Sequence, residues 1–458
     1  MSLIIRDARN LRGERIDIAI ENAKIGAVEA HVGRRGTEFD AGGATVLPGL
    51  HDHHLHILAT AAHRHSIDLA ACRDLVQVRG AITRAARAAP RGSWLRATGY
   101  DEWAGGLPAR ADLDAWAPHH RLRLQDRTGA LWVLNSRALQ SLPNNGEWPS
   151  GAERHGDGSP TGRFWREDSW LREHLPRSEL QLDSLGAEFA AFGLTGLTDA
   201  GAGNGPEAAA TLAGAMPQRL TIMGDETLER GRGYRLGPLK MLIDERDPPA
   251  PEAVANRIAT ARGQWRNVAA HCVTAAELAL FLAALELAGG ARVGDRIEHG
   301  GMIGDAAIVA IAVTPLTVVT NPGFVRDRGD RYRAMIAPGD WPDLYRAASL
   351  RAAGIPLAAG SDAPYASADP WRAMRAARDR LTASGDPLGL GERLDASAAL
   401  KLYLGQPNCP GGISRTIAPG QPADLILCDG PWEAISADLS ADRVRATVIA
   451  GDIVFSRA

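Results

Sequence analysis

Residues 48–56 read Pro48-Gly49-Leu50-His51-Asp52-His53-His54-Leu55-His56 and follow the apolar run Ala44-Thr45-Val46-Leu47. They hold four of the chain's 13 histidines. The apolar run predicts a buried strand, on which alternate side chains share a face. Asp52, His54 and His56 are therefore expected on one face, and His51 and His53 on the other, toward the helix layer. Two imidazoles about 7 Å apart along one face can bind the same metal ion. A solvated histidine loop or tag is the alternative, but a tag would lie at a terminus without an apolar lead-in.

The length and composition favour a large α/β protein and give no sign of a nucleic-acid or membrane partner. The chain has 458 residues, which suits an α/β barrel with an appendage. With 45% hydrophobic residues and a net charge of -3, neither a nucleic-acid nor a membrane-surface partner is expected. We find no apolar run of about 18 residues that would predict a membrane span, and no apolar core of a signal peptide near the N-terminus.

The cysteines indicate a cytoplasmic location. They are widely spaced and form no CxxC pair, which favours a reduced compartment over a disulfide framework. The four are Cys72, Cys272, Cys409 and Cys428.

Short apolar runs broken by polar turns lie near both ends of the chain. Residues 16–20 and 24–28 have this pattern, as do residues 424–428 and 446–455, the last split by a Gly-Asp turn. Such runs predict strands. We therefore expect one small β-sandwich domain built from residues 1–47 and 406–458.

Between the ends, strand-like apolar runs alternate with helical patterns about every 30 residues. This alternation indicates βα units with a parallel sheet, and enough units are present to close a (β/α)8 TIM-type barrel over residues 48–405. The candidate strands are residues 196–199, 220–223, 239–243, 267–271, 296–299, 316–319 and 355–359.

Residues from about 93 to 180 interrupt this alternation and predict a lid-like insertion. Tyr100 and Trp103 are candidates for an apolar substrate wall, with packing inside the insertion as the alternative. Arg163 and Arg166 are candidates for binding a substrate carboxylate, with structural ion pairs as the alternative. The insertion is rich in tryptophan, at positions 94, 103, 116, 132, 148, 165 and 170.

Several later strands end in polar residues that an apolar strand does not need. Lys240 interrupts one such run, His271 and His299 end the next two, and Asp362 follows another. The first three are each separated by about one βα unit, or roughly 30 residues. Because the C-terminal ends of barrel strands surround one mouth, these residues are expected to meet the histidines of residues 48–56 there. Imidazole and carboxylate suit Zn²⁺ and similar divalent ions.

The sequence resembles the amidohydrolase superfamily, and within it the branch called amidohydrolase family 3, or YtcJ-like. The superfamily pattern Pro-Gly-x-x-Asp-x-His-x-His is matched at residues 48–56. Further matches span nearly the whole chain and lie at residues 99–103, 107–114, 132–136, 161–162, 296–299, 360–364 and 419–425.

The resemblance implies one or two divalent ions, with zinc as the default and iron, manganese or cobalt as alternatives. His54 and His56 would bind the more buried ion, and His271 and His299 the second. Lys240 would react with CO₂ to form a carbamate that bridges the two.

The resemblance also implies hydrolysis of a carbon–nitrogen bond other than a peptide bond, in an amide, cyclic imide or carbamate. Asp362 would bind the first metal and act as general base and acid, while a metal-bound hydroxide attacks the substrate carbon. A homodimer is a family-level expectation.

Two positions depart from the branch. Ala130 follows Arg127-Thr128-Gly129 where the branch commonly has histidine, which indicates a different substrate. Asp244-Glu245 stands where the branch often has Asp-Gly.

Three alternative functions are possible. A heterocyclic-amine deaminase would resemble His-x-x-Glu after strand five, but His271-Cys272-Val273-Thr274 lacks that glutamate. Hydrolysis of an ester or phosphoester is open to the same scaffold. A non-catalytic metal-binding module would be favoured by loss of Asp362 or Lys240, and both are present.

Overall fold

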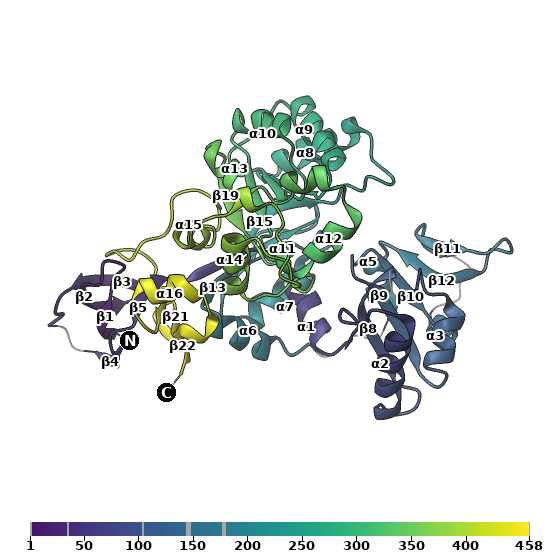
Figure 1. The fold of residues 1–458 in the computed structure, drawn as a ribbon, viewed down its shortest axis with the longest axis horizontal. Helices are drawn as coiled ribbons and strands as arrows, with labels where there is room; N and C mark the ends of the chain where they lie inside the picture. The colour runs from purple at the N-terminus through teal and green to yellow at the C-terminus, as the bar shows by residue number, and fades with distance from the viewer. Residues whose placement is uncertain (1, 34–35, 103–104, 143–147, 176–179, 458) are drawn as a thin grey trace. The chain divides into compact units, whose positions relative to one another are not determined.

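The computed structural model describes residues 2–33, 36–102, 105–142, 148–175 and 180–457. The chain forms two compact units (Figure 1). The first unit combines residues Met1–Ile57 with Leu182–Ala458, and the second is Leu58–Gln181.

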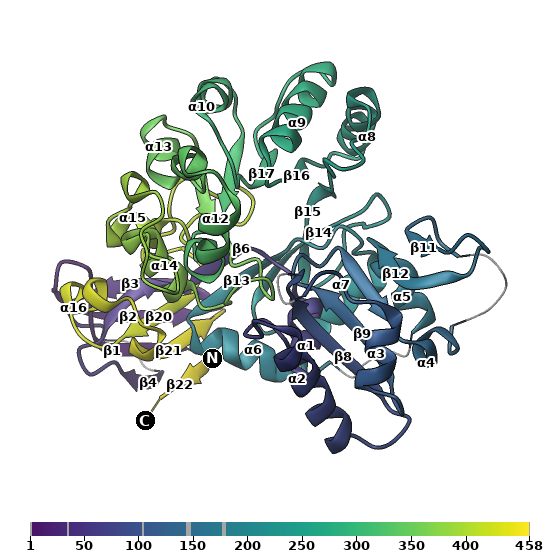
Figure 2. The same cartoon turned by 45° about the vertical axis from the view of Figure 1, so that its right-hand side comes forward.

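The centre of the first unit is a sheet of eight parallel strands. Helices follow most of these strands and lie on the outside of the sheet (Figure 2). The expected strands are all present, with ends shifted by a few residues. In spatial order they are β6 (Leu50–Leu55), β13 (Leu194–Asp199), β14 (Arg219–Gly224), β15 (Tyr234–Met241), β16 (Val268–Cys272), β17 (Arg296–His299), β18 (Thr317–Thr320) and β19 (Leu357–Ala359).

The segment after β19 runs beside β6 and nearly closes the barrel. The Asp362 N–H donates to the His54 carbonyl at 2.7 Å, and the His56 N–H donates to the Ala363 carbonyl at 2.9 Å. Gly360 permits this approach, since a Cβ there would lie 2.4 Å from the Cβ of His54. The barrel that the alternating pattern predicts is therefore confirmed, and its seam joins the first and last metal-ligand candidates in the sequence.

The helices of the barrel begin with local signals that the sequence carries. At α9 (Ala275–Leu287), the Thr274 hydroxyl accepts the Glu277 N–H at 3.2 Å, and the Glu277 carboxylate accepts the N–H groups of Val273 and Thr274. This capping box satisfies N–H groups that the first helical turn leaves unpaired. The other helices are α6 (Leu182–Ala191), α7 (Pro206–Ala215), α8 (Pro251–Gly263), α10 (Asp305–Ala312), α11 (Gly323–Asp327), α12 (Gly329–Met335), α13 (Ala347–Ala352), α14 (Pro370–Asp379), α15 (Ala396–Lys401) and α16 (Trp432–Asp438), with short 3-10 turns at Pro338–Asp343, Leu390–Glu392 and Ala441–Arg443.

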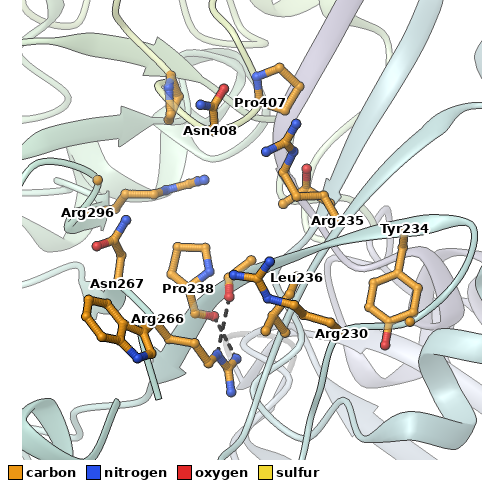
Figure 3. A pocket seen from close by; sticks show the side chains of 16 residues that line it. Arg230, Tyr234, Arg235, Leu236, Pro238, Arg266, Asn267, Arg296, Pro407 and Asn408 are labelled. Carbon is orange, nitrogen blue, oxygen red and sulfur yellow. Dashed lines mark hydrogen bonds between the residues drawn. The ribbon is translucent and has the colours of Figure 1, made fainter. Parts of the chain in front are cut away.

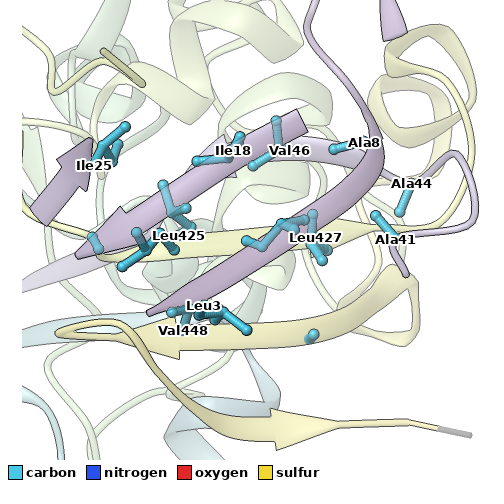
Figure 4. Close-up of a cluster of buried hydrophobic side chains, with 14 residues drawn as sticks. Leu3, Ala8, Ile18, Ile25, Ala41, Ala44, Val46, Leu425, Leu427 and Val448 are labelled. Atoms are coloured by element: carbon cyan, nitrogen blue, oxygen red, sulfur yellow. The ribbon is translucent and has the colours of Figure 1, made fainter. Parts of the chain in front are cut away.

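Both ends of the chain contribute to a second sheet in this unit. Apolar side chains such as Ile18, Val46, Leu425 and Val448 form its buried cluster (Figure 4). The first part of the prediction, one sheet from both termini, is confirmed; a separate β-sandwich domain stays a prediction. The strands run in the order β22 (Asp452–Ser456), β21 (Val444–Ile449), β20 (Leu425–Cys428), β5 (Thr45–Pro48), β1 (Leu3–Arg9), β2 (Arg15–Glu21) and β3 (Lys24–Glu29), with β4 (Thr37–Asp40) paired to β1.

The second unit contains the predicted insertion of residues 93–180 and begins earlier, at Leu58. It is built on a six-stranded mixed sheet. The strands run in the order β11 (Ala152–Arg154), β12 (Pro160–Trp165), β10 (Leu131–Leu134), β9 (Arg121–Asp126), β8 (Trp94–Tyr100) and β7 (Ile67–Asp68). Its helices are α2 (Leu75–Ala88), α3 (Arg110–Trp116), α4 (Ser136–Leu139) and α5 (Asp168–His174), while α1 (Ile57–Arg64) begins at the boundary between the units.

Among the described residues, no helix is both long enough and apolar enough to cross a membrane.

Candidate metal centre

A β-bulge in β6 sets the direction of the histidines. Asp52 pairs with Leu197 and Leu55 pairs with Asp199, so β6 advances three residues while β13 advances two. The Asp52 carboxylate accepts the N–H of His54, two residues further on, at 3.0 Å. An extra residue of this kind breaks the alternation of side chains along a strand. Histidines before and after the bulge can therefore both reach the barrel interior. They are His51, His53, His54 and His56.

His51 and His53 correct the prediction from simple alternation. The Nε2 of His51 lies 2.8 Å from the Thr198 hydroxyl, and the rings of His51 and His53 lie 4.5 Å apart. Arg296 donates to the His53 carbonyl at 2.7 Å. Burial, together with nearby positive charge that includes Arg296, lowers the pKa of both histidines well below the usual value. The two neutral rings lie inside the barrel, so the expectation that they face the helix layer is wrong.

Among the described residues, His54, His56 and Asp362 lie close enough together to hold one metal ion. One candidate ligand atom from each residue lies within 4.8 Å of the other two. The Oδ1 of Asp362 is 3.5 Å from His54 Nε2 and 3.1 Å from His56 Nε2. Asp362 has a φ of 55°, a left-handed backbone conformation that is uncommon outside glycine and often marks a functional position. These three residues, predicted from the sequence, are brought together by the barrel seam.

His271 and His299 extend this group. The ring of His299 lies 4.6 Å from that of His54 and 4.5 Å from that of His271. The Nδ1 of His299 is 2.8 Å from Asn321 Oδ1, an acceptor, so Nδ1 carries the proton and Nε2 keeps its lone pair for a metal. Burial lowers the pKa of His299 to about 3, which keeps the ring neutral, as metal binding requires.

Lys240 has the surroundings of a reactive amine. It is 2% exposed, and its Nζ makes no hydrogen bond to any residue that the structure describes. Burial lowers its pKa, although the carboxylates of Glu298 and Asp362 work in the opposite direction. A lower pKa raises the fraction of neutral amine, which is the form that reacts with CO₂. The neighbouring residues thus match the predicted carbamylation without testing it.

Glu298 is a functional candidate that the sequence analysis missed. Its carboxylate forms an ion pair with Arg296 at 2.7 Å and a short contact with the Nδ1 of His54. Burial alone would raise the pKa of Glu298, but the charges of Arg296, His54 and Lys240 hold it far below the usual range. The carboxylate accepts the Nδ1 proton of His54, which leaves Nε2 facing Asp362. The sequence contains one sign of this role, because Glu298 is a charged residue within a short strand that is expected to be buried.

One tyrosine ring lies beside this group, and two further tyrosines contact each other. The ring of Tyr365 lies 5.7 Å from that of His56, and Arg328 donates to the Tyr365 carbonyl at 3.1 Å. The hydroxyls of Tyr332 and Tyr345 lie 3.0 Å apart. Tyr365 was not predicted, because it lies in an irregular segment between β19 and α14, which carries no periodic signal.

The substrate candidates of the second unit have contacts within that unit. Tyr100 is buried and donates its hydroxyl to the Gly106 carbonyl at 2.6 Å. Arg163 donates to the carbonyls of Leu107 and Pro108, each at 3.2 Å. Arg166 is exposed, and Trp103 lies outside the described residues. Their role in substrate binding stays a prediction.

Comparison with known proteins identifies the family. The model of the amidohydrolase family matches residues 37–455. This chain belongs to the amidohydrolase family. The resemblance seen in the sequence is thereby confirmed.

Two relatives are similar over most of their length. The N-substituted formamide deformylase of Arthrobacter pascens is 26% identical, over 91% of this chain and 90% of the relative. The amidohydrolase YtcJ of Bacillus subtilis, itself described as putative, is 25% identical over 92% and 90% of the two chains.

Solved structures share the fold. An uncharacterised metal-dependent hydrolase from Pyrococcus horikoshii superposes with a TM-score of 0.74 at 17% identity, over 95% of this chain and 99% of the other. The N-isopropylammelide isopropylaminohydrolase of Burkholderia multivorans superposes with a TM-score of 0.55 at 18% identity, over 99% and 98%. At these identities the similarity concerns the fold.

Proposed function

We propose that this amidohydrolase is a metal-dependent enzyme that hydrolyses a carbon–nitrogen bond in an amide, a cyclic imide or a carbamate. The observation that carries the proposal is the convergence of His54, His56 and Asp362 at one point of the barrel mouth, with His299 in ring contact. The similarity to a deformylase of N-substituted formamides supports the choice of bond.

The residues present fit divalent metal ions. His54 Nε2 is buried and makes no hydrogen bond to any described residue, although Glu298 holds its other nitrogen. A neutral imidazole oriented in this way by a carboxylate is a typical metal ligand. We assign His54, His56 and Asp362 to one ion and His271 and His299 to a second, with zinc as the first choice of metal. Lys240, as a carbamate, is proposed to bridge the two ions.

Such ions would activate a water molecule and polarise the substrate carbonyl. Asp362 supplies the proton transfer: its carboxylate takes a proton from the attacking water and passes it to the leaving nitrogen. Burial alone would raise the pKa of Asp362, but the nearby rings of His54 and His56 hold it well below its usual value, so the carboxylate is ionised and can accept that proton. Glu298 orients His54 and thereby acts as a positioning residue.

The proposed substrates are small and neutral at the reacting bond. We retain Tyr100, Trp103, Arg163 and Arg166 as proposed substrate contacts, and Ala130 as the position that separates this chain from relatives with histidine there. A cytoplasmic location and a homodimer are proposed alongside.

The test is a turnover assay of zinc-loaded protein against N-substituted formamides, cyclic imides and carbamates. Asp362→Asn is expected to lower kcat by about 10² to 10⁴-fold, because a positioned general base contributes that much. Asp452→Asn, an exposed position of the terminal sheet, is the matched control and should keep full activity. Ammonia release from heterocyclic amines, with no hydrolysis in the panel, would instead identify a deaminase. Two bound metals without any turnover would indicate a binding module.

A further inference from the structure

A cavity of about 490 Å³ lies at the amino ends of several barrel strands (Figure 3). The proposed metal ligands lie at or after the carboxyl ends of the strands. Thr221 and Arg235 stand near the starts of β14 and β15, and Asn267 and Arg296 near the starts of β16 and β17. Asn408, from the loop that follows α15, lines another side. The volume is within the range of small-molecule sites, about 300–1,000 Å³.

The lining of this cavity is strongly cationic. It contains Arg230, Arg235, Arg266 and Arg296, and no aspartate or glutamate is among the described residues that line it. Figure 3 shows the guanidinium groups of Arg230, Arg235 and Arg296 turned toward the cavity from different sides. Like charges around one cavity repel each other unless negative charge lies near them.

Two of these arginines already form hydrogen bonds or an ion pair within the protein. Arg266 is 5% exposed and donates to five backbone carbonyls, among them those of Gly237 and Pro238. Arg296 is 1% exposed and is paired with Glu298. Arg230 and Arg235, by contrast, are exposed and make no side-chain hydrogen bond or ion pair with any residue that the structure describes. They are the two guanidinium groups available to a ligand.

Trp265 lines this cavity with a largely exposed aromatic side chain. The Arg266 N–H donates to the Ala261 carbonyl at 2.9 Å, so Trp265 occupies the position just after α8 that glycine prefers. Its φ is 56° and its side chain is 91% exposed. A large aromatic side chain at a strained, solvent-exposed position has no packing role, and such outliers are often functional. Tyr234 lines the same cavity.

We propose that this cavity binds a phosphate group, either as free phosphate or as a phosphate monoester of a small aromatic compound that packs on Trp265. Guanidinium groups bind phosphate by paired, charge-assisted hydrogen bonds, and a compact dianion balances the unpaired charge of Arg230 and Arg235 better than a neutral ligand. The proposal is independent of the hydrolytic function, because none of the proposed metal ligands lines the cavity.

The experiment is calorimetric titration of the metal-loaded protein with inorganic phosphate, adenosine 5′-monophosphate, adenosine and malonate. Saturable binding of phosphate or the monophosphate is expected, and Arg230→Gln/Arg235→Gln should weaken it at least about tenfold. Arg232→Gln is the matched control: it removes the same charge from the same exposed segment but does not line the cavity. Its binding should equal that of the native protein.

Free phosphate and an aromatic phosphate monoester are distinguished by comparing their affinities. If the ligand is a monoester, the monophosphate binds more tightly than phosphate and Trp265→Ala removes that advantage; if it is free phosphate, the two bind equally. The proposal is overturned if no phosphate compound binds, if binding survives the double substitution, or if Arg232→Gln weakens it equally. It is also overturned if malonate binds more tightly than phosphate or adenosine as tightly as its monophosphate. Phosphate held at the metal centre would be insensitive to the double substitution, so the two sites are distinguished.

Discussion

At the scale of single residues, Glu298 connects the stability of the barrel to the proposed chemistry. It is fully buried between Arg296 and His54, and its ionised form depends on both. A buried ion pair is costly to create, but removing one partner leaves the other charge buried without compensation. The same carboxylate fixes the ring of a proposed metal ligand, so a loss there should affect both folding and metal binding.

Glu298→Gln is therefore expected to destabilise the protein by about 3–5 kcal/mol and to weaken metal binding. Urea unfolding and metal content after dialysis are the measurements. The control is Glu38→Gln, which also breaks a bond to an arginine, Arg6, but at a 57% exposed carboxylate. Exposed pairs contribute about 1 kcal/mol or less. Equal effects of the two substitutions would show that Glu298 has no special role.

Lys240 is the residue on which the two-metal proposal depends. Lys240→Ala removes the side-chain amine that is proposed to form the carbamate. The metal content should therefore fall from two ions toward one per chain. The rate of hydrolysis should fall by about 100-fold or more. Lys401→Ala, at an exposed lysine, is the control. Added formate or acetate should restore part of the activity by supplying a bridging carboxylate, whereas unchanged metal content would contradict the bridging role.

At the scale of elements, the sequence predicted the barrel better than it predicted the direction of its side chains. Strand β17 has the predicted limits at Arg296 and His299, because a short buried run bounded by turns is visible in the sequence. The bulge in β6 is not visible there, since it depends on pairing with β13. His54 lies beside Asp362, as expected, whereas the expected direction of His51 is wrong because the bulge was not foreseen.

The partners of these ligands were missed for a related reason. Asn321 and Tyr365 follow strands in irregular segments, and their contacts with His299 and His56 arise only when β6, β17 and the last two strands of the barrel close into a ring. Periodicity predicts elements, but it does not predict which loop side chains meet at a barrel mouth.

The seam between β19 and β6 gives a prediction at this scale. Gly360→Ala would place a Cβ 2.4 Å from the Cβ of His54 and 2.5 Å from its backbone nitrogen. Because neither atom is the flexible end of a side chain, the strands must separate, at a cost of about 1–3 kcal/mol. Metal binding should weaken as well, because separating the strands moves His54 away from Asp362. Gly391→Ala is the control, since a Cβ there meets nothing within 4 Å. Denaturant unfolding and metal titration of both variants decide the matter; equal behaviour would mean that the seam tolerates a wider spacing.

At the scale of the whole molecule, the proposed centre joins strands that are far apart in sequence, from His54 on β6 to Asp362 after β19. A metal ion bound by residues of the first strand and of the segment after the last strand stabilises the closed barrel, because the unfolded chain cannot present these groups together. Metal binding should therefore contribute to the stability of the first unit as well as to catalysis.

Removal of metal by a chelator is accordingly expected to abolish hydrolysis and to lower the thermal midpoint of unfolding. A metal at about 1,000 times its Kd adds about 4 kcal/mol to the native state, which a thermal scan detects easily. Zn²⁺, Mn²⁺, Co²⁺ and Fe²⁺ are added back separately, and the ion that restores both activity and thermal midpoint at two per chain is the functional one. In Asp362→Asn, adding the same metal ions should raise the thermal midpoint of unfolding by less than in the native protein and should restore no activity. If chelation left the midpoint unchanged while activity was lost, the ions would act on the substrate alone and would not hold β6 to the segment after β19.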